Sequence, residues 1–373
     1  MTGTIDTTMD TTDTTGAATL DMSRVGEFAQ QVGGMLAGGV TTAMMVVGDR
    51  LGLYAAMADG RATTSAELAE RTGLSERYVR EWLSQQAAVG FVAYTAADGT
   101  FTLPPEHAAV LATDDSPASM IGAAGTVTGM HRRTDRVADA FRTGEGIPWG
   151  EQDAATFEAT ERFFRVGYRT SLVGEWVPAL TGVEEKLREG ATVVDVGCGH
   201  GAPLLLLAEA FPRSRFIGYD VHEGSVKVAR QRAAGAGVAD RTRFEVSDGH
   251  GYQDEGVDVI TFFDAFHDLG DPVGAAAHAR RALADDGTLV LVEPRAGDDL
   301  ATTLATVPLA PISLATSTFM CTPNSLSQPV GLALGAAAGQ RRLREVLEQA
   351  GFGTIRVAAE SDVNIVMEAT SGP

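Results

Sequence analysis

The spacing of hydrophobic and polar positions changes along the chain and divides it into units of different character. Residues 1–20 are mostly Thr, Asp, Gly and Ala, which is too polar for a packed core, so we expect a disordered lead-in. From 22 to 58 the apolar positions follow a helical period, and within it we expect 41–47 to form a buried helix. Beyond residue 186, short apolar runs alternate with helical stretches, which predicts an α/β domain.

Helix signals and strand signals follow one another closely in the second unit. A first helix is expected to start at a Thr64 cap and to end at Gly73, and a second helix to follow a cap at Ser75. Two strand-like runs, 91–94 and 100–103, flank a turn. A helix, a turn, a second helix and a hairpin together predict a winged helix.

The charge pattern bears on what this winged helix does. The chain has 29 Lys and Arg against 49 Asp and Glu, a formal net charge of −20 at pH 7. In the second helix the bases at 77 and 80 are balanced by acids at 76 and 81. Because nucleic-acid binding needs a basic surface, we favour a structural or dimerising role over DNA recognition and expect no nucleic-acid partner.

One segment has the features of a loop that binds a cofactor. The apolar run 191–196 has the length of a buried parallel strand, and it leads directly into Gly-Cys-Gly-His-Gly at 197–201. Glycines at alternate positions allow a tight turn and a close approach of the backbone to a ligand, and the helix that follows offers free N–H groups. A second strand, 215–220, ends in Asp220 at the spacing typical of a ribose-binding acid.

This motif distinguishes between two classes of cofactor-binding domain. Its third glycine comes one residue too early for the Gly-x-Gly-x-x-Gly fingerprint of NAD- and flavin-binding domains, which remain the alternative. Asp-Val-Gly-Cys-Gly-His-Gly at 195–201 instead resembles motif I of the class I S-adenosylmethionine (SAM)-dependent methyltransferases. The resemblance implies SAM as cofactor and a Rossmann-like α/β domain with seven strands, in the order 3-2-1-4-5-7-6, the last antiparallel. It implies contacts with SAM from Asp195, Gly197, Cys198, Gly199, Gly201, Asp220, Val221, Asp248, Gly249, Phe263 and Tyr168.

A second resemblance concerns the segment after the fourth expected strand, 257–263. His-Asp-x-x-Asp at 267–271 is similar to the His-Asp-Trp-x-Asp signature of small-molecule O-methyltransferases, which also carry a winged-helix dimerisation domain. It implies that His267 is the general base, since an imidazole suits the deprotonation of a hydroxyl near neutral pH, and that Glu293 holds it. The family's second supporting carboxylate falls near Gln340 here, a departure that leaves N- or C-methylation by positioning alone open as an alternative.

The remaining site predictions concern the methyl acceptor. Asp264 is expected either to hydrogen-bond the acceptor or cofactor or to act as a base, and the insertion 296–339 is long enough to be a lid. The residues expected to contact the acceptor are Phe164, His267, Phe319, Met320 and Asn324. Their surroundings favour a moderately apolar, neutral or cationic small molecule. Asp268 and Asp271 are better explained as residues at the start of a helix than as metal ligands, so no metal is expected.

These features predict a lead-in at 1–20, a winged-helix dimerisation domain at 21–105, a helical connector at 106–185 and a SAM-binding catalytic domain at 186–373. The resemblance also implies a homodimer formed through the N-terminal domain. We see no signal peptide, no apolar run approaching the roughly 20 residues of a membrane span, and no disulfide framework. A cytoplasmic enzyme without membrane contact is therefore expected, and a SAM-sensing transcriptional regulator is the third interpretation.

Overall fold

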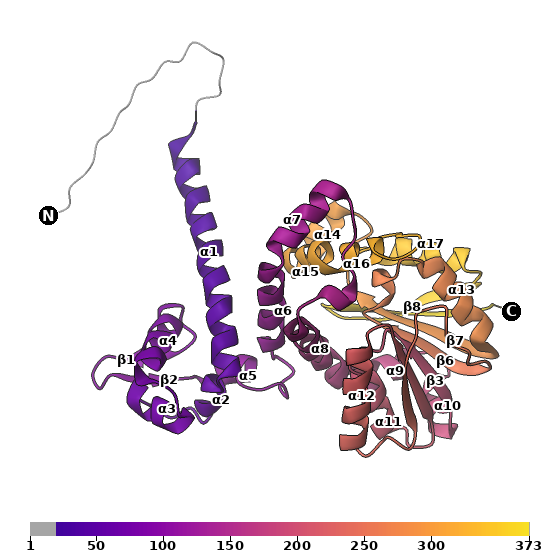
Figure 1. Ribbon diagram of the computed structural model, residues 1–373, viewed down its shortest axis with the longest axis horizontal. Coiled ribbons are helices and arrows are strands. Elements are labelled where there is room, and N and C mark those ends of the chain that lie inside the picture. Colours follow the sequence, from indigo (N-terminus) through magenta and orange to yellow (C-terminus); the bar gives the residue numbers. More distant parts are fainter. Residues whose placement is uncertain (1–19, 373) are drawn as a thin grey trace, which may run out of the picture.

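The computed structural model describes residues 20–372, so the lead-in expected at 1–20 lies, except for its last residue, outside the described residues. Figure 1 shows a small helical unit near the N-terminus with one long protruding helix, a set of connecting helices, and a larger α/β unit. A winged helix and a Rossmann-like sheet therefore occur in the expected order.

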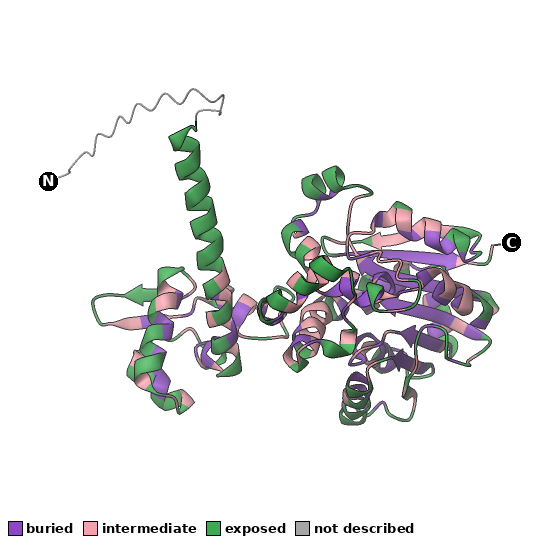
Figure 2. Ribbon diagram, turned by 45° about the horizontal axis from the view of Figure 1, so that its top comes forward, coloured by how far each residue is buried: buried purple, intermediate pink, exposed green. Residues whose placement is uncertain are grey.

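The long helix α1, Met22–Arg50, is followed after a break by α2, Leu53–Ala56. The break falls at Gly52, whose left-handed backbone (φ 69°) ends the helix that was expected to continue to residue 58. The buried residues of α1 are only Thr41, Val46 and Gly48. The expectation of a buried helix at 41–47 is therefore wrong, because only one side of this stretch meets the rest of the chain, and Figure 2 shows that the protruding turns are exposed.

The winged helix has its own small hydrophobic core. Its elements are α3 (Ser65–Thr72), α4 (Glu76–Ala88), β1 (Ala93–Thr95), β2 (Thr100–Thr102) and α5 (Pro105–Leu111). Thr64 caps α3 as expected, in a reciprocal capping box with Glu67, and Gly73 ends that helix with φ 68°. Ser75 precedes α4, but its side chain accepts no hydrogen bond there.

Connecting helices join this unit to the α/β unit. They are α6 (Ile121–Arg132), α7 (Thr134–Thr143), α8 (Ala154–Gly167), the π-helical segment η2 (Tyr168–Trp176), α9 (Val177–Ala179) and α10 (Val183–Glu189). Helices α6 and α8 pack closely, since a Cβ at Gly125 would lie only 2.6 Å from Ala159 Cβ. Arg162 of α8 pairs with Asp49 of α1 at 2.7 Å and with Asp114 at 2.7 Å, and so ties the N-terminal unit to the connector.

Seven strands form the central sheet of the α/β unit. They are β3 (Thr192–Val196), β4 (Arg215–Asp220), β5 (Thr242–Val246), β6 (Val257–Phe263), β7 (Leu283–Pro294), β8 (Thr354–Glu360) and β9 (Asn364–Thr370). Their order is β5-β4-β3-β6-β7-β9-β8, and β9 runs antiparallel to both neighbours. Counted within the domain, this is the predicted order 3-2-1-4-5-7-6, which is confirmed.

Helices cover both faces of the sheet, which explains why its parallel strands are almost continuously apolar. One face packs against η2, α10, α11 (Ala202–Ala210) and α12 (Glu223–Gly235). The other face packs against α13 (Pro272–Ala282) and α17 (Gly339–Gln349).

The insertion after β7 is helical and lies beyond the ends of the strands. We call this insertion, together with connector residues 147–149 that dock on it, the roof. The elements of the insertion are α14 (Leu300–Thr306), α15 (Ala310–Thr316), the π-helical segment η4 (Ser317–Cys321) and α16 (Thr322–Leu326). The connector docks on it, because Ile147 N donates to Pro323 O at 2.7 Å and Trp149 N donates to Asn324 Oδ1 at 3.0 Å. Two segments far apart in the sequence therefore close over the same edge of the sheet.

Candidate active site

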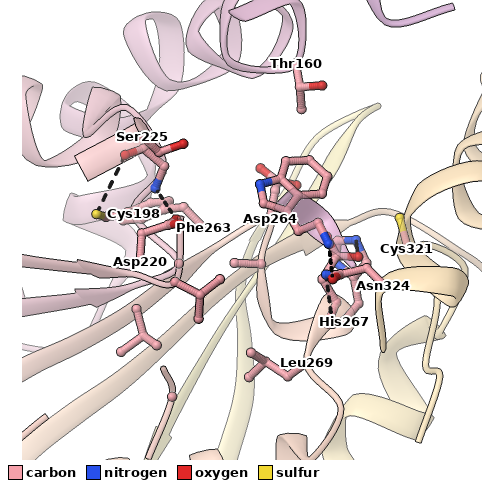
Figure 3. Close-up of a pocket in the computed structure, with 18 of the residues that line it drawn as sticks. Thr160, Cys198, Asp220, Ser225, Phe263, Asp264, His267, Leu269, Cys321 and Asn324 are labelled. Atoms are coloured by element: carbon pink, nitrogen blue, oxygen red, sulfur yellow. Dashed lines mark hydrogen bonds and ion pairs between the residues drawn. The ribbon is translucent and has the colours of Figure 1, made fainter. Parts of the chain in front are cut away.

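A cavity of about 610 Å³ lies beyond the carboxyl ends of the parallel strands. Val196, Asp220 and Phe263, which end β3, β4 and β6, all line it. This is where open α/β sheets bind their ligands. Figure 3 shows Cys198 and Asp220 on one side of the cavity and His267, Cys321 and Asn324 on the other.

The glycine loop between β3 and α11 forms one wall of the cavity. Gly197 and Gly199 have left-handed backbones, with φ 80° and 52°, and a Cβ at Gly197 would lie 2.5 Å from Ala265 Cβ. Asp220 accepts hydrogen bonds from Gly199 N at 2.8 Å and from His222 N at 2.8 Å. The loop and the acid at the end of the second strand are thereby fixed relative to each other.

Asp195 lies at the end of β3, directly before the glycine loop, and is fully buried. One of its oxygens accepts from Thr261 Oγ1 at 2.8 Å, while Oδ2 has no hydrogen-bond partner. Burial raises the pKa of Asp195 to about 7. We call Asp195, residues 197–199, Asp220 and Asp248 the cofactor lobe of the cavity.

The cofactor lobe matches the chemical groups of SAM. A glycine turn leaves room for the methionine portion, and the carboxylate of Asp220 suits ribose hydroxyls. The buried oxygen of Asp195 without a partner suits a positively charged ligand, which would compensate that carboxylate once it is ionised. The residues present therefore fit SAM.

His267 lies at the opposite end of the cavity, in the short turn η3 (Phe266–Asp268), and is 3% exposed. Its Nδ1 donates to Glu293 Oε2 at 2.6 Å, and Glu293 also accepts from Phe266 N at 2.9 Å. On the other side of the ring, Nε2 lies 3.3 Å from Asp268 Oδ1. Burial opposes the charged ring, but Glu293 and Asp268 outweigh it and raise the pKa of His267 well above its ordinary value.

Asp264 lies between the two ends of the cavity and is held by two side chains. Its Oδ2 accepts from Tyr168 Oη at 2.6 Å, and its Oδ1 accepts from Asn364 Nδ2 at 2.7 Å. Its backbone is left-handed (φ 50°), a strained conformation for a residue with a side chain. Burial raises the pKa of Asp264 to about 7.

Most side chains expected at the site line this one cavity. They are Phe164, Tyr168, Asp195, Gly197, Cys198, Gly199, Asp220, Val221, Asp248, Gly249, Phe263, Asp264, His267, Met320 and Asn324. Three expected residues lie outside its lining. Gly201 is the N-cap of α11, Glu293 is buried beside His267, and Phe319 packs against the small core around Met130.

Several lining residues were not expected from the sequence. Trp149 and Phe157 come from the connector and pack against each other, and Cys321 ends η4 close to His267. Gln340, where the second supporting carboxylate was expected, instead lies at the start of α17, and Asp268 is the second carboxylate beside His267. No local sequence pattern links these positions, because their proximity depends on how the roof docks.

Comparison with known proteins identifies the two units. Residues 39–113 match the Rv2258c-like winged HTH domain, and residues 187–351 match a methyltransferase domain. The chain therefore carries a methyltransferase domain. Its fold is that of the mitomycin 7-O-methyltransferase structure, with a TM-score of 0.68 and 22% identity over 94% of this chain and 100% of that one. Human N-acetylserotonin methyltransferase, solved in complex with SAM, gives a TM-score of 0.66 and 16% identity over 96% and 100% of the two chains.

Curated relatives match this chain over part of their length. The 27-O-demethylrifamycin SV methyltransferase of Amycolatopsis mediterranei is 30% identical over 38% of this chain and 48% of its own. Methyltransferase ungE' of Aspergillus campestris is 32% identical over 32% of this chain and 38% of its own. The chain therefore spans about half or less of the length of these relatives.

The buried carboxyl of Asp195 predicts how the stability of this protein depends on pH. Because its folded pKa is raised, the unfolded state ionises first as pH rises, so the free energy of unfolding falls between the unfolded pKa of about 4 and the folded value. Asp195→Asn keeps the shape without the charge. We expect its advantage in the free energy of unfolding over the unsubstituted protein to grow by about 2–4 kcal/mol from about pH 5 to about pH 8, seen as a growing advantage in unfolding temperature.

Thermal unfolding of both proteins without ligand across this range measures the effect. Asp285→Asn, at an exposed position, is the matched control and should leave the pH dependence unchanged. Parallel curves for Asp195→Asn and the unsubstituted protein would contradict a raised pKa at Asp195.

Proposed function

We propose that this protein transfers the methyl group of SAM to a hydroxyl of a small, moderately apolar acceptor, with His267 as the general base. The observation that carries the proposal is the buried pair of His267 and Glu293 at the cavity, with Nε2 on the side of the ring away from Glu293. That is the arrangement needed to take a proton and stabilise the resulting imidazolium.

The chain's own residues have three tasks in this reaction. SAM, when bound, supplies an activated methyl group and a good leaving group. The glycine loop, Asp195 and Asp220 hold and orient it, and the roof excludes water from the acceptor. In its neutral form, His267 takes the hydroxyl proton at Nε2, and Glu293 fixes the ring and stabilises the charge that results.

The charge of the cavity limits the acceptor. Among the described residues that line it, none is Lys or Arg, whereas seven are acids: Glu161, Asp195, Asp220, Asp248, Asp264, Asp268 and Asp271. An anionic or phosphorylated acceptor would be repelled, so a neutral or cationic molecule is favoured. A solved O-methyltransferase of the same fold is described in complex with S-adenosylhomocysteine and 1,4-dihydroxy-2-naphthoic acid, which supports screening hydroxylated aromatic compounds first.

Two other functions are separated from this one by simple observations. N- or C-methylation would need positioning without a base, and the position of the methyl group in a product distinguishes it. A SAM-sensing regulator would show specific DNA binding at physiological salt. The arginines of α4 do not favour DNA binding, because Arg77 is paired with Glu81 and Arg80 with Glu76.

The role of His267 predicts the effect of removing its ring. In His267→Ala, turnover should fall by about 10²- to 10⁴-fold, the usual contribution of a general base, while SAM affinity is unchanged because the cofactor lobe is intact. Turnover by mass detection of product and SAM binding by calorimetry measure the two effects. His131→Ala, at an exposed histidine, is the control. Turnover retained in His267→Ala would rule out His267 as the base.

We also propose that the protein is a cytoplasmic homodimer formed through α1. Apolar side chains along the middle of α1 are 41–71% exposed: Phe28, Val32, Met35, Leu36 and Val40. They form a stripe at helical spacing that is covered by no described part of this chain. Helix α1 is also long and apolar enough to cross a membrane by length and composition alone, so the expectation of no such segment was too strict. Helix α1 belongs to the winged-helix unit, which resembles a dimerisation domain. This favours a second copy of the chain, rather than a membrane, as the partner of the stripe.

A dimer predicts that charge on this stripe gives a monomer. Met35→Glu combined with Leu36→Glu should halve the molar mass measured by sedimentation equilibrium, because the carboxylates would be buried in the interface. Gln31→Glu, at an exposed polar position of the same helix, should remain dimeric. A monomeric unsubstituted protein, or one that co-sediments with lipid vesicles through this stripe, would contradict the dimer.

A further inference from the structure

Three side chains with metal-binding atoms converge at the acceptor end of the cavity. His267, Asp268 and Cys321 each offer one such atom, and the three atoms lie within 4.8 Å of one another. His267 and Cys321 are 3% and 4% exposed. This set differs from the three carboxylates considered from the sequence, because it combines an imidazole, a carboxylate and a thiol.

We propose that His267 Nε2, Asp268 Oδ1 and Cys321 Sγ form a binding site for Zn²⁺. Tetrahedral zinc with its usual bond lengths sets neighbouring ligand atoms about 3.3–3.8 Å apart. Nε2 and Oδ1 are already 3.3 Å apart, so only a small movement closes the site. A thiolate together with an imidazole favours zinc over Mg²⁺ or Ca²⁺.

The surroundings hold these ligands in place before any cation binds. Glu293 accepts from Nδ1 of His267 at 2.6 Å, which directs Nε2 into the site, the arrangement usual behind a zinc-bound histidine. The backbone carbonyl of Asp268 accepts from Gln328 Nε2 at 2.9 Å and from Asn324 Nδ2 at 3.3 Å. These bonds from α16 and the residues that follow it fix the position of Asp268.

A second observation points to a missing partner at this place. Asp268 Oδ1 is buried and makes no hydrogen bond, although His267 Nε2 lies 3.3 Å from it. A buried carboxylate oxygen without a partner is costly, and a cation would compensate it. Asn324 and Met320 line the cavity beside the three ligands, so the fourth coordination position would face the cavity.

Binding at this site has a consequence for catalysis, which rests on the proposed function. Zn²⁺ takes the lone pair of Nε2, and the protons of Nε2 and of the Cys321 thiol are both released to solvent. With that lone pair occupied, His267 cannot accept the hydroxyl proton. The site is therefore inhibitory, and because the ion occupies the place beside Nε2 that the acceptor hydroxyl needs, zinc and acceptor exclude each other.

Cobalt(II) substitution tests the site without acceptor or SAM. Titration of the full-length protein with Co²⁺ in the absence of oxygen should produce a near-ultraviolet thiolate-to-cobalt band and the intense visible bands of a tetrahedral ion. Excess Zn²⁺ should abolish them. The chain has two cysteines, both buried, so Cys321→Ser should lose the near-ultraviolet band and Cys198→Ser should keep it.

The spectra decide the binding site independently of the reaction. No thiolate band in the unsubstituted protein, or a band that persists in Cys321→Ser, would overturn the site and leave the methyl-transfer proposal standing. If Cys321→Ser does not fold, Asp268→Asn keeps the thiol but should weaken Co²⁺ binding by about tenfold or more. Unchanged Co²⁺ affinity in Asp268→Asn would also overturn the proposed metal site.

Once an acceptor is found, inhibition gives a second measurement. Zn²⁺ should inhibit turnover competitively with acceptor, reversibly with a chelator, and Glu293→Gln should weaken Zn²⁺ binding by about 10- to 100-fold. Inhibition that does not compete with acceptor would contradict mutual exclusion of zinc and acceptor at His267. Failure of the chain to methylate any hydroxyl, with the cobalt bands present, would count against the proposed function alone.

Discussion

The site depends on the register between β6 and β7. Phe263 pairs with Val292 across the two strands, and Asp264 N donates to Val292 O at 2.7 Å. This register places Glu293 beside the turn that follows β6, where it accepts from the backbone of Phe266 and from His267 Nδ1. A shift by one residue would turn Glu293 to the other face of the sheet and leave His267 without its partner.

The same register between β6 and β7 explains why the short turn η3 suits both proton transfer and cation binding. The carboxylate behind His267 raises the basicity of its ring, and a more basic imidazole is both a better proton acceptor and a better metal ligand. Asp268 and Cys321 lie on the other side of that ring. Proton transfer and cation binding therefore compete for Nε2.

Local sequence predicted the strands next to the glycine loop, and the resemblance to methyltransferases supplied the order of the sheet. A strand, a glycine turn, a helix and an acid at the end of the next strand follow one another within 195–220, so their geometry follows from chain connectivity. The acceptor end could not be predicted in the same way. Trp149 hydrogen-bonds to Asn324, which is 175 positions away in the sequence. Cys321 lies near His267 only because the insertion folds back over the strand ends. Likewise, the apolar stretch 41–47 indicated a helix without showing which surface would cover it.

Calorimetric titration with SAM and with S-adenosylhomocysteine tests most directly whether the glycine loop is a cofactor site. The unsubstituted protein should bind both. Asp220→Ala should weaken both by about tenfold or more, through loss of charged hydrogen bonds, and Asp285→Ala should not. Folded, unsubstituted protein that binds neither ligand would contradict the assignment of this cavity to SAM.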